Sequence, residues 1–352
     1  MPELEAAACS LAAHRQKLAQ QNKTENEGTS EFGKVVTSET KGEIASNGAF
    51  VRQKNRFDTP FGDGEGQLPV EAGRYRLIWT PLCPWATRQV IAFKLLGITE
   101  DVISIGKVAP TRTDKGWEFS LDKDGVDPVL GIRYLPEIYA STDPEYQGRA
   151  TVPTIVDLKT RKVVNNDYHK LTNYWETVWK PFWKEGAPDL YPVELRTGID
   201  ALNEILFNEI NNGVYKAGFA RSQEQYELNY DLVFDRLDWL EEHLSYNRFL
   251  FGDRLTDSDI RLYVTLARFD IAYYFGFRLN KKRIRDYENL WNYAKELYSI
   301  PAFKEATDFD AIKRGYLLGA TENPNNILPL GPDNSVWEEP NNRSKKFGEL
   351  KI

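Results

Sequence analysis

Cys83 is the residue best placed to do chemistry. It follows the strand-like run RYRLIWT and opens the helical run in TPLCPWATRQVIAF, residues 80–93. A thiol at a helix N-terminus lies near free backbone N–H groups and the positive end of the helix dipole, and both favour the thiolate. Pro84 suits the first helical turn because it has no N–H to leave unpaired. We therefore predict a nucleophilic thiol with a lowered pKa, and Arg88 one turn later adds positive charge.

The thiol has no nearby cysteine partner. Ala86 occupies the place of the second cysteine of a C-x-x-C pair, so a disulfide formed by Cys83 must join an outside thiol. The alternative is a buried structural cysteine. The segment ATVPTIV favours reactivity, because thioredoxin-like folds place a cis-proline facing the thiol at such a Thr-Val-Pro. The backbone of Val152 can there pair with a peptide-like substrate as an added strand would.

The elements around Cys83 alternate between strand and helix. RYRLIWT, VISIGKV, ATVPTIVDL and RKVVNN read as strands, and PWATRQVIAFKLLG and DYHKLTNYWETVW read as helices, the first ending at Gly97. This order predicts a thioredoxin-like α/β domain with a mixed sheet over residues 71–185. An insertion at 108–148 is longer than such a module needs, which suggests a functional role.

The second half of the chain predicts an all-α domain over residues 190–320. Apolar residues recur there at helical spacing, and Thr256 with Asp259 forms a capping box. Residues 1–70 read as an extended or poorly ordered arm, in which Cys9 is interpreted as incidental, and 321–352 as an extended tail. The fold class is therefore α/β plus all-α.

Composition excludes several classes of protein. A net charge of −7 argues against nucleic-acid binding, and no apolar run approaches the length of a membrane span. The polar N-terminus is no signal peptide, and two cysteines fit a reducing compartment, so we expect a cytoplasmic protein. The scattered histidines and cysteines predict no metal site, and phosphate-binding glycine motifs are absent, which predicts no nucleotide. The aromatic content of 13% suits a pocket for a flat ligand.

An ordered set of segments resembles the glutathionyl-hydroquinone reductases, the Xi class of the omega-like glutathione transferases. The resemblance covers about residues 55–332. The matching segments are LPVEAGRYRLIW, CPWA, GWEF, DPEYQGRATVPTIVDLKTRKVVNN, GVYKAGFA, DRLTDSDIRLYVTLARFD and NPNNILPLGP. The box CPWA is a weak signal alone, whereas the ordered set is specific. The resemblance implies a glutathione-transferase-type helical C-terminal domain and a homodimer.

The resemblance also implies a covalent mechanism on S-conjugates of hydroquinones. Cys83 matches the nucleophile, which forms a mixed disulfide with glutathione and frees the hydroquinone before a second thiol resolves the disulfide. Tyr215 matches the proton donor to the quinol, Tyr273 a residue that supports the thiolate, and Tyr316 a residue over the quinol pocket. The co-substrate is glutathione or another low-molecular-weight thiol. For each tyrosine taken singly, core packing is the commoner role.

The residues implied to contact the thiol co-substrate lie in three segments. Trp117 packs on it, Arg149 to Val152 give main-chain contacts, and the helix start after β-strand RKVVNN holds its γ-glutamyl end. These residues are Trp117, Arg149, Ala150, Thr151, Val152, Asp167 and Tyr168.

The chain departs from the family pattern on the thiol side. Thr87 replaces a histidine, Pro136 replaces an arginine, and Asp167-Tyr168 replaces a Glu-Ser pair, with Arg133 a candidate substitute for the lost arginine. The segment GYLLGATENP also lacks two histidines. These changes motivate the hypothesis that the thiol is not glutathione or is bound differently. An omega-like thioltransferase or dehydroascorbate reductase, and a non-catalytic transferase-like binding protein, are the alternative functions.

Overall fold

Four short strands form the mixed sheet that the sequence predicts. They are β1 (Tyr75–Trp79), β2 (Ile103–Lys107), β3 (Thr154–Asp157) and β4 (Lys162–Asn165) in the computed structural model, which describes residues 43–320 and 323–352. The strand order is β2-β1-β3-β4, with β1 parallel to β2 and antiparallel to β3. Leu77 at the centre of β1 is in register with Ile105 and Ile155. Every residue of β1 and β3 is buried, so both faces of the sheet centre are covered.

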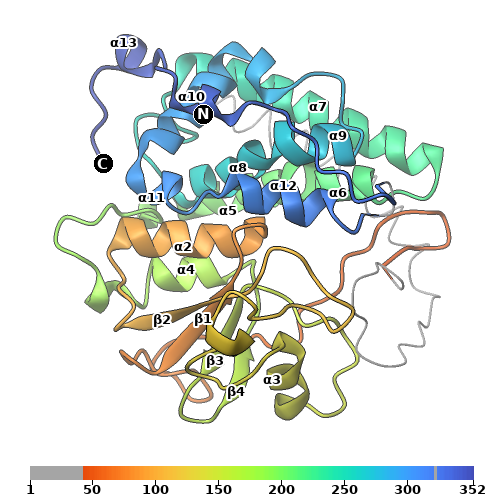
Figure 1. The fold of residues 1–352 in the computed structure, drawn as a ribbon. Coiled ribbons are helices and arrows are strands. Elements are labelled where there is room, and N and C mark those ends of the chain that lie inside the picture. Colours follow the sequence, from red (N-terminus) through yellow and green to blue (C-terminus); the bar gives the residue numbers. More distant parts are fainter. Residues whose placement is uncertain (1–42, 321–322) are drawn as a thin grey trace.

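Three helices complete the thioredoxin-like domain, namely α2 (Pro84–Leu96), α3 (Leu135–Thr142) and α4 (Leu171–Trp175). Helix α2 begins directly after Cys83 and ends at Gly97, whose φ of 76° is left-handed, as a glycine C-cap permits. Helices α2 and α4 lie between the sheet and the helical domain, and α3 lies on the side away from it (Figure 1). The 108–148 segment therefore holds α3 together with long connecting loops.

The second domain is helical, as predicted. Its helices are α5 (Arg196–Ile205), α6 (Gly213–Gly218), α7 (Gln223–Tyr246), α8 (Asp257–Arg268), α9 (Tyr274–Gly276), α10 (Glu288–Ser299), α11 (Pro301–Lys304), α12 (Phe309–Leu317) and α13 (Arg343–Phe347). The capping box of α8 is confirmed, because Asp259 accepts from the backbone N–H of Thr256 at 2.8 Å. Two π-helical turns interrupt the helices, namely Leu206–Asn211, which precedes α6 and Tyr215, and Phe269–Tyr273.

The chain before β1 packs on both domains from residue 43 onward. Phe50, Phe61 and Leu68 are buried in the core. Arg52 donates to the Asn212 side chain of the helical domain at 2.8 Å, whereas Asn55 donates to Asp167 of the thioredoxin-like domain at 3.0 Å. This segment therefore joins the two domains beside Cys83. Cys9 lies outside the described residues.

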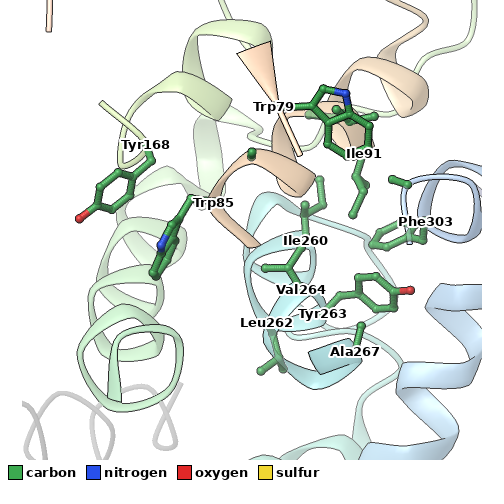
Figure 2. Close-up of a cluster of buried hydrophobic side chains, with 14 of the residues drawn as sticks. Trp79, Trp85, Ile91, Tyr168, Ile260, Leu262, Tyr263, Val264, Ala267 and Phe303 are labelled. Atoms are coloured by element: carbon green, nitrogen blue, oxygen red, sulfur yellow. The ribbon is translucent and has the colours of Figure 1, made fainter. Parts of the chain in front are cut away.

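The domain interface is apolar around one buried arginine. Ile91 of α2 faces Ile260 and Val264 of α8 within a cluster of buried side chains (Figure 2). Beside this cluster the guanidinium of Arg268, 1% exposed, donates to the backbone carbonyls of Pro81 at 2.6 Å and Leu82 at 2.9 Å. The end of α8 is thereby bonded to the loop that carries Cys83.

A second polar contact between the domains contains two buried carboxyl groups. Asp257 of α8 pairs with Arg261 at 2.6 Å, and Arg261 also donates to the His169 carbonyl at 3.0 Å. Glu176, at the end of α4, is 2% exposed. Burial and the charge of Asp257 hold the pKa of Glu176 well above its usual range. Since Asp257 has the arginine partner, Glu176 is the carboxyl group that stays protonated.

Replacing Glu176 by Gln is expected to flatten the pH dependence of stability. The raised pKa means that folded Glu176 keeps a proton that the unfolded chain releases, so the wild type loses stability as pH rises from the ordinary glutamate value toward the folded one. The slope reaches up to about 1.4 kcal/mol per pH unit. Urea unfolding of both proteins across this pH range measures the difference. Exposed Glu185→Gln is the control, and an E176Q slope equal to that of wild type would contradict the assignment.

Candidate active site

The thiol of Cys83 lies where the two domains and the chain before β1 meet. Cys83 is the N-cap residue of α2, and its Sγ donates to the carbonyl of Val152 at 3.2 Å. The Val152–Pro153 peptide bond is cis, as predicted from the Thr-Val-Pro segment. The structure therefore brings together the cysteine and the Val152 backbone, which lie 69 residues apart in the chain.

The prediction of a lowered thiol pKa is wrong in direction. The Cys83 residue as a whole is half-buried, but protein surrounds its sulfur atom. This burial raises the pKa of the thiol. The backbone N–H groups of Ala86 and Trp85 act in the opposite direction, as expected at a helix start. Burial outweighs them because the helix end is enclosed by the second domain.

Two arginines other than the predicted one act on the thiol. The charges of Arg268 and Arg112 lower the pKa of Cys83, although less than burial raises it. Arg88 is 1% exposed and donates to the Tyr168 carbonyl, and burial lowers its own pKa to about 9. Arg88 therefore joins α2 to the segment before α4, and the charge of Cys83 raises its pKa, so it also attracts the thiolate as predicted. Arg268 could not be placed from sequence because its contacts cross more than 180 residues.

The three predicted tyrosines form one hydrogen-bonded cluster. They come from α6, the π-helical turn Phe269–Tyr273, and α12. The Tyr215 hydroxyl lies 2.5 Å from that of Tyr316 and 3.4 Å from that of Tyr273, and the last two are 3.1 Å apart. Burial raises the pKa of all three phenols, so they are protonated at neutral pH. The charge of Cys83 also raises the pKa of Tyr215, which places that phenol within electrostatic range of the thiol.

Arg52 is a site residue that sequence reasoning missed. Its guanidinium carbon lies 4.6 Å from the Tyr215 ring centroid and 5.2 Å from that of Trp85. Its Nη2 is buried and has no hydrogen-bond partner among the described residues. The residue lies in the chain before β1, to which no chemistry was assigned, and a lone arginine in a loop-like segment gives no signal.

Asp167 and Tyr168 lie beside Arg52 at one end of the site. Together with Arg52, Asn55 and Asn212 they line a cavity of about 400 Å³. Asp167 accepts from the side chain of Asn55 and from the His169 backbone N–H, each at 3.0 Å. The ring of Tyr168 lies against Trp85 with centroids 5.0 Å apart (Figure 2). This end offers two carboxylates, of Asp58 and Asp167, and several hydrogen-bond donors to a ligand that carries a positive and a negative group.

The segment from Arg149 to Val152 is fixed by internal bonds. Arg149 pairs with Glu43 at 2.6 Å, and Ala150 is buried. The Thr151 carbonyl accepts from the Tyr139 hydroxyl at 3.0 Å. The Arg149 carbonyl likewise accepts from the Tyr146 hydroxyl at 2.6 Å, so two of the main-chain carbonyls in the predicted segment are bonded within the protein.

Trp117 lies beneath Arg112 on the loop after β2. The ring is 2% exposed, and the guanidinium carbon of Arg112 lies 4.2 Å from its centroid. The Trp117 indole N–H is buried without an acceptor in the described chain. Arg112 was also missed, because no motif marks an arginine five residues before a tryptophan.

Thr87 and Pro136, which replace family residues, and Arg133, the candidate substitute, each have other partners in the structure. Thr87 is buried, donates to the Cys83 carbonyl at 2.9 Å and accepts from Arg268 at 2.8 Å. Arg133 donates to the Asp124 carbonyl at 2.7 Å. Pro136 lies against Gly116, where an added Cβ would be 2.9 Å from the proline ring. Thr87 is therefore part of the domain interface and says little about which thiol binds.

The arrangement can activate a sulfur nucleophile and deliver protons to an aromatic ligand. It combines one thiol, two cations near it and three protonated phenols, with aromatic rings on the walls. Among residues 43–320 and 323–352, no group of three or more His, Cys, Asp or Glu side chains could hold a metal ion. No helix in this part of the chain is long and apolar enough to cross a membrane.

Comparison with known proteins places the chain among glutathione transferases. Residues 223–296 match the family described as glutathione S-transferase, C-terminal domain. The chain is 37% identical over 314 residues to the glutathionyl-hydroquinone reductase YqjG of Escherichia coli K12, covering 86% of this chain and 95% of the relative.

Two solved structures extend this similarity to the fold. The glutathione S-transferase Xi of Phanerochaete chrysosporium superimposes with a TM-score of 0.78 at 37% identity, covering 83% of this chain and 95% of that one. A glutathione-bound structure of YqjG gives a TM-score of 0.75 at 36% identity, covering 86% of this chain and 99% of that one.

Alkylation of Cys83 is expected to require a higher pH than alkylation of a free cysteine. Only the thiolate reacts, and burial disfavours it, so the midpoint of the pH–rate profile should lie above that of a solvent-exposed thiol. Mass spectrometry of the Cys83 peptide after timed treatment with iodoacetamide measures the profile, with N-acetylcysteine amide as the reference in the same tube. A midpoint below that of the reference would show that the helix start and the cations outweigh burial.

Proposed function

This chain belongs to the glutathionyl-hydroquinone reductases, the Xi class of glutathione transferases, and we propose that it reductively cleaves S-conjugates of hydroquinones through a mixed disulfide on Cys83. It is an enzyme of this family with the thioredoxin-like and helical domains of a glutathione transferase. The observation that carries the proposal is the cluster of three mutually bonded phenols within electrostatic range of the thiol.

In the proposed first step the Cys83 thiolate attacks the sulfur of the conjugate. The new sulfur–sulfur bond forms as the bond between sulfur and the aromatic carbon breaks, and the aromatic carbon takes the bonding electron pair and a proton. The products are the hydroquinone and the mixed disulfide. A second small thiol then attacks this mixed disulfide. The products are the disulfide of the two small thiols and free Cys83. The two thiols therefore supply both electrons that reduce the carbon–sulfur bond.

The phenols supply the proton that the first step needs. Tyr215, Tyr273 and Tyr316 are held in their protonated forms by burial, so each can donate and none is a base at neutral pH. Tyr215 bonds to both other hydroxyls, which lets a proton lost from one phenol be replaced from the next. Arg52, close to the Tyr215 ring, lowers the pKa of that phenol and stabilises charge that develops on it.

Burial raises the pKa of the Cys83 thiol, and its thiolate is therefore a strong nucleophile. A thiolate of higher pKa is intrinsically more nucleophilic, although less of it is present. The bond from Sγ to the Val152 carbonyl holds the proton of the neutral thiol. Arg112 and Arg268 stabilise the thiolate once that proton has left.

Glutathione is the co-substrate that the relatives support. The E. coli relative is named a glutathionyl-hydroquinone reductase, and its structure is described as glutathione-bound. Asp167 would bond the α-amine of the γ-glutamyl group, and Arg52 would bond its carboxylate across the cavity of about 400 Å³. A thiol other than glutathione is the second candidate, because Tyr168 and Pro136 bring no charge where the family pattern has polar groups. A homodimer and a cytoplasmic location stay predictions.

Replacing Cys83 by Ala is expected to abolish turnover of glutathionyl-menadiol, because no other described thiol is present.

Tyr215→Phe should lower kcat by roughly 100-fold through loss of the proton donor, with little change in KM. Steady-state rates with glutathione and with other small thiols measure both effects and identify the co-substrate.

Exposed Tyr246→Phe is the matched control and should retain full activity. Retained turnover in C83A would eliminate the mixed-disulfide mechanism. Reduction of small disulfides at a rate that the Tyr215 variant leaves unchanged, without cleavage of the conjugate by wild type, would instead indicate a general thioltransferase. Micromolar affinity for glutathione would eliminate the second candidate thiol.

A further inference from the structure

Arg112 is a cation in the active site without a counter-charge. It lies on the loop between β2 and Trp117, where the residue as a whole is exposed to solvent whereas protein surrounds its guanidinium group. Its one close interaction among the described residues is with the Trp117 ring, at 4.2 Å from guanidinium carbon to centroid. The protein around the guanidinium lowers its pKa to about 10, so it remains charged at neutral pH. A charged guanidinium with five N–H donors and no acceptor is available for a ligand.

The groups near Arg112 do not neutralise it. Cys83 and Tyr215 act on its charge from the reacting centre, and Arg149 repels it. Glu43, the carboxylate that also acts on Arg112, is bonded to Arg149 at 2.6 Å. The loop thus presents an excess of positive charge toward the region between the thiol and Trp117.

Trp117 adds a second unpaired donor at the same place. The residue is only 2% exposed, and its indole N–H has no acceptor in the described chain. A buried donor without an acceptor is uncommon in native proteins and calls for a partner. Both side chains donate, so the partner must bring acceptor atoms.

Two described residues near Trp117 supply no free cation at this end of the site. Pro136 brings an apolar ring against Gly116, and Arg133 is bonded to the Asp124 carbonyl. The opposite end, at Asp167, is a separate cavity whose lining includes Arg52 but not Arg112. An extended thiol peptide with its sulfur at Cys83 and its amino-terminal residue at Asp167 would direct its carboxyl end toward Arg112.

We propose that Arg112, supported by the Trp117 ring, binds the carboxylate on the C-terminal side of the cysteine in the thiol co-substrate, which in glutathione is the glycyl carboxylate. This inference rests on the proposed function, because it assumes that a peptide-like thiol binds at Cys83. Planar guanidinium and carboxylate groups match in a two-bond geometry that lysine cannot copy. Arg112 is then a specificity residue that selects thiols with a free carboxylate at that position.

Calorimetric binding of two probes tests the inference. The probes are S-methylglutathione and its glycyl monoethyl ester, which differ only in that carboxylate. Wild type should bind the free acid roughly 10- to 100-fold more tightly than the ester, as expected for a bond between charged groups. Arg112→Leu should bind both probes equally and weakly, and Arg112→Lys should keep part of the preference. Arg254→Leu, at an exposed arginine of the helical domain whose bond goes to Glu194, should behave as wild type.

Several results would overturn the inference. Equal binding of the two probes by wild type, a full preference in R112L, or no measurable binding of either probe would each do so. The wild-type comparison stands even if a variant fails to fold. Because binding needs no turnover, the outcome is separable from the proposed function. A preference in a protein that cleaves no conjugate refutes only the function, and cleavage without a preference refutes only this inference.

Discussion

The bonds from the buried guanidinium of Arg268 determine where the thiol lies. From the end of α8 this group donates to the carbonyls of Pro81 and Leu82 and to the Thr87 hydroxyl. The loop that presents Cys83 is therefore positioned by the helical domain as well as by its own backbone bonds to Thr80 and Thr87. A buried charge is costly unless it is fully hydrogen-bonded, and here backbone oxygens on both sides of the interface meet that requirement.

The same enclosure has two chemical consequences. It raises the pKa of the Cys83 thiol, and it raises the pKa of the three tyrosines. Nucleophile and acids are thus both shifted toward their protonated forms, which suits a reaction that ends with protonation of an aromatic carbon. Two cations, Arg268 and Arg112, and the backbone N–H groups at the helix start lower the pKa of the thiol. They thereby favour the thiolate that attacks the conjugate.

Features that depend on neighbouring residues could be predicted from the sequence, and features that depend on distant contacts could not. The ends of α2 at Cys83 and Gly97, the capping box of α8 and the strands follow from local patterns. The direction of the thiol pKa depends on how the helical domain covers the helix start. From the motif alone, Thr87 in place of a histidine indicates a change in the thiol-binding site. In the structure its hydroxyl instead accepts a bond from Arg268 in the domain interface. Arg52 and Arg112 carry no motif, so only their positions in space reveal them.

Intact-mass spectrometry of a single turnover tests the central claim most directly. The protein is mixed with one equivalent of a glutathionyl-hydroquinone and no second thiol. The account predicts one glutathionyl group bound to Cys83 as a disulfide, with release of an equal amount of hydroquinone. Release of hydroquinone from protein of unchanged mass, or an adduct on another residue, would contradict it.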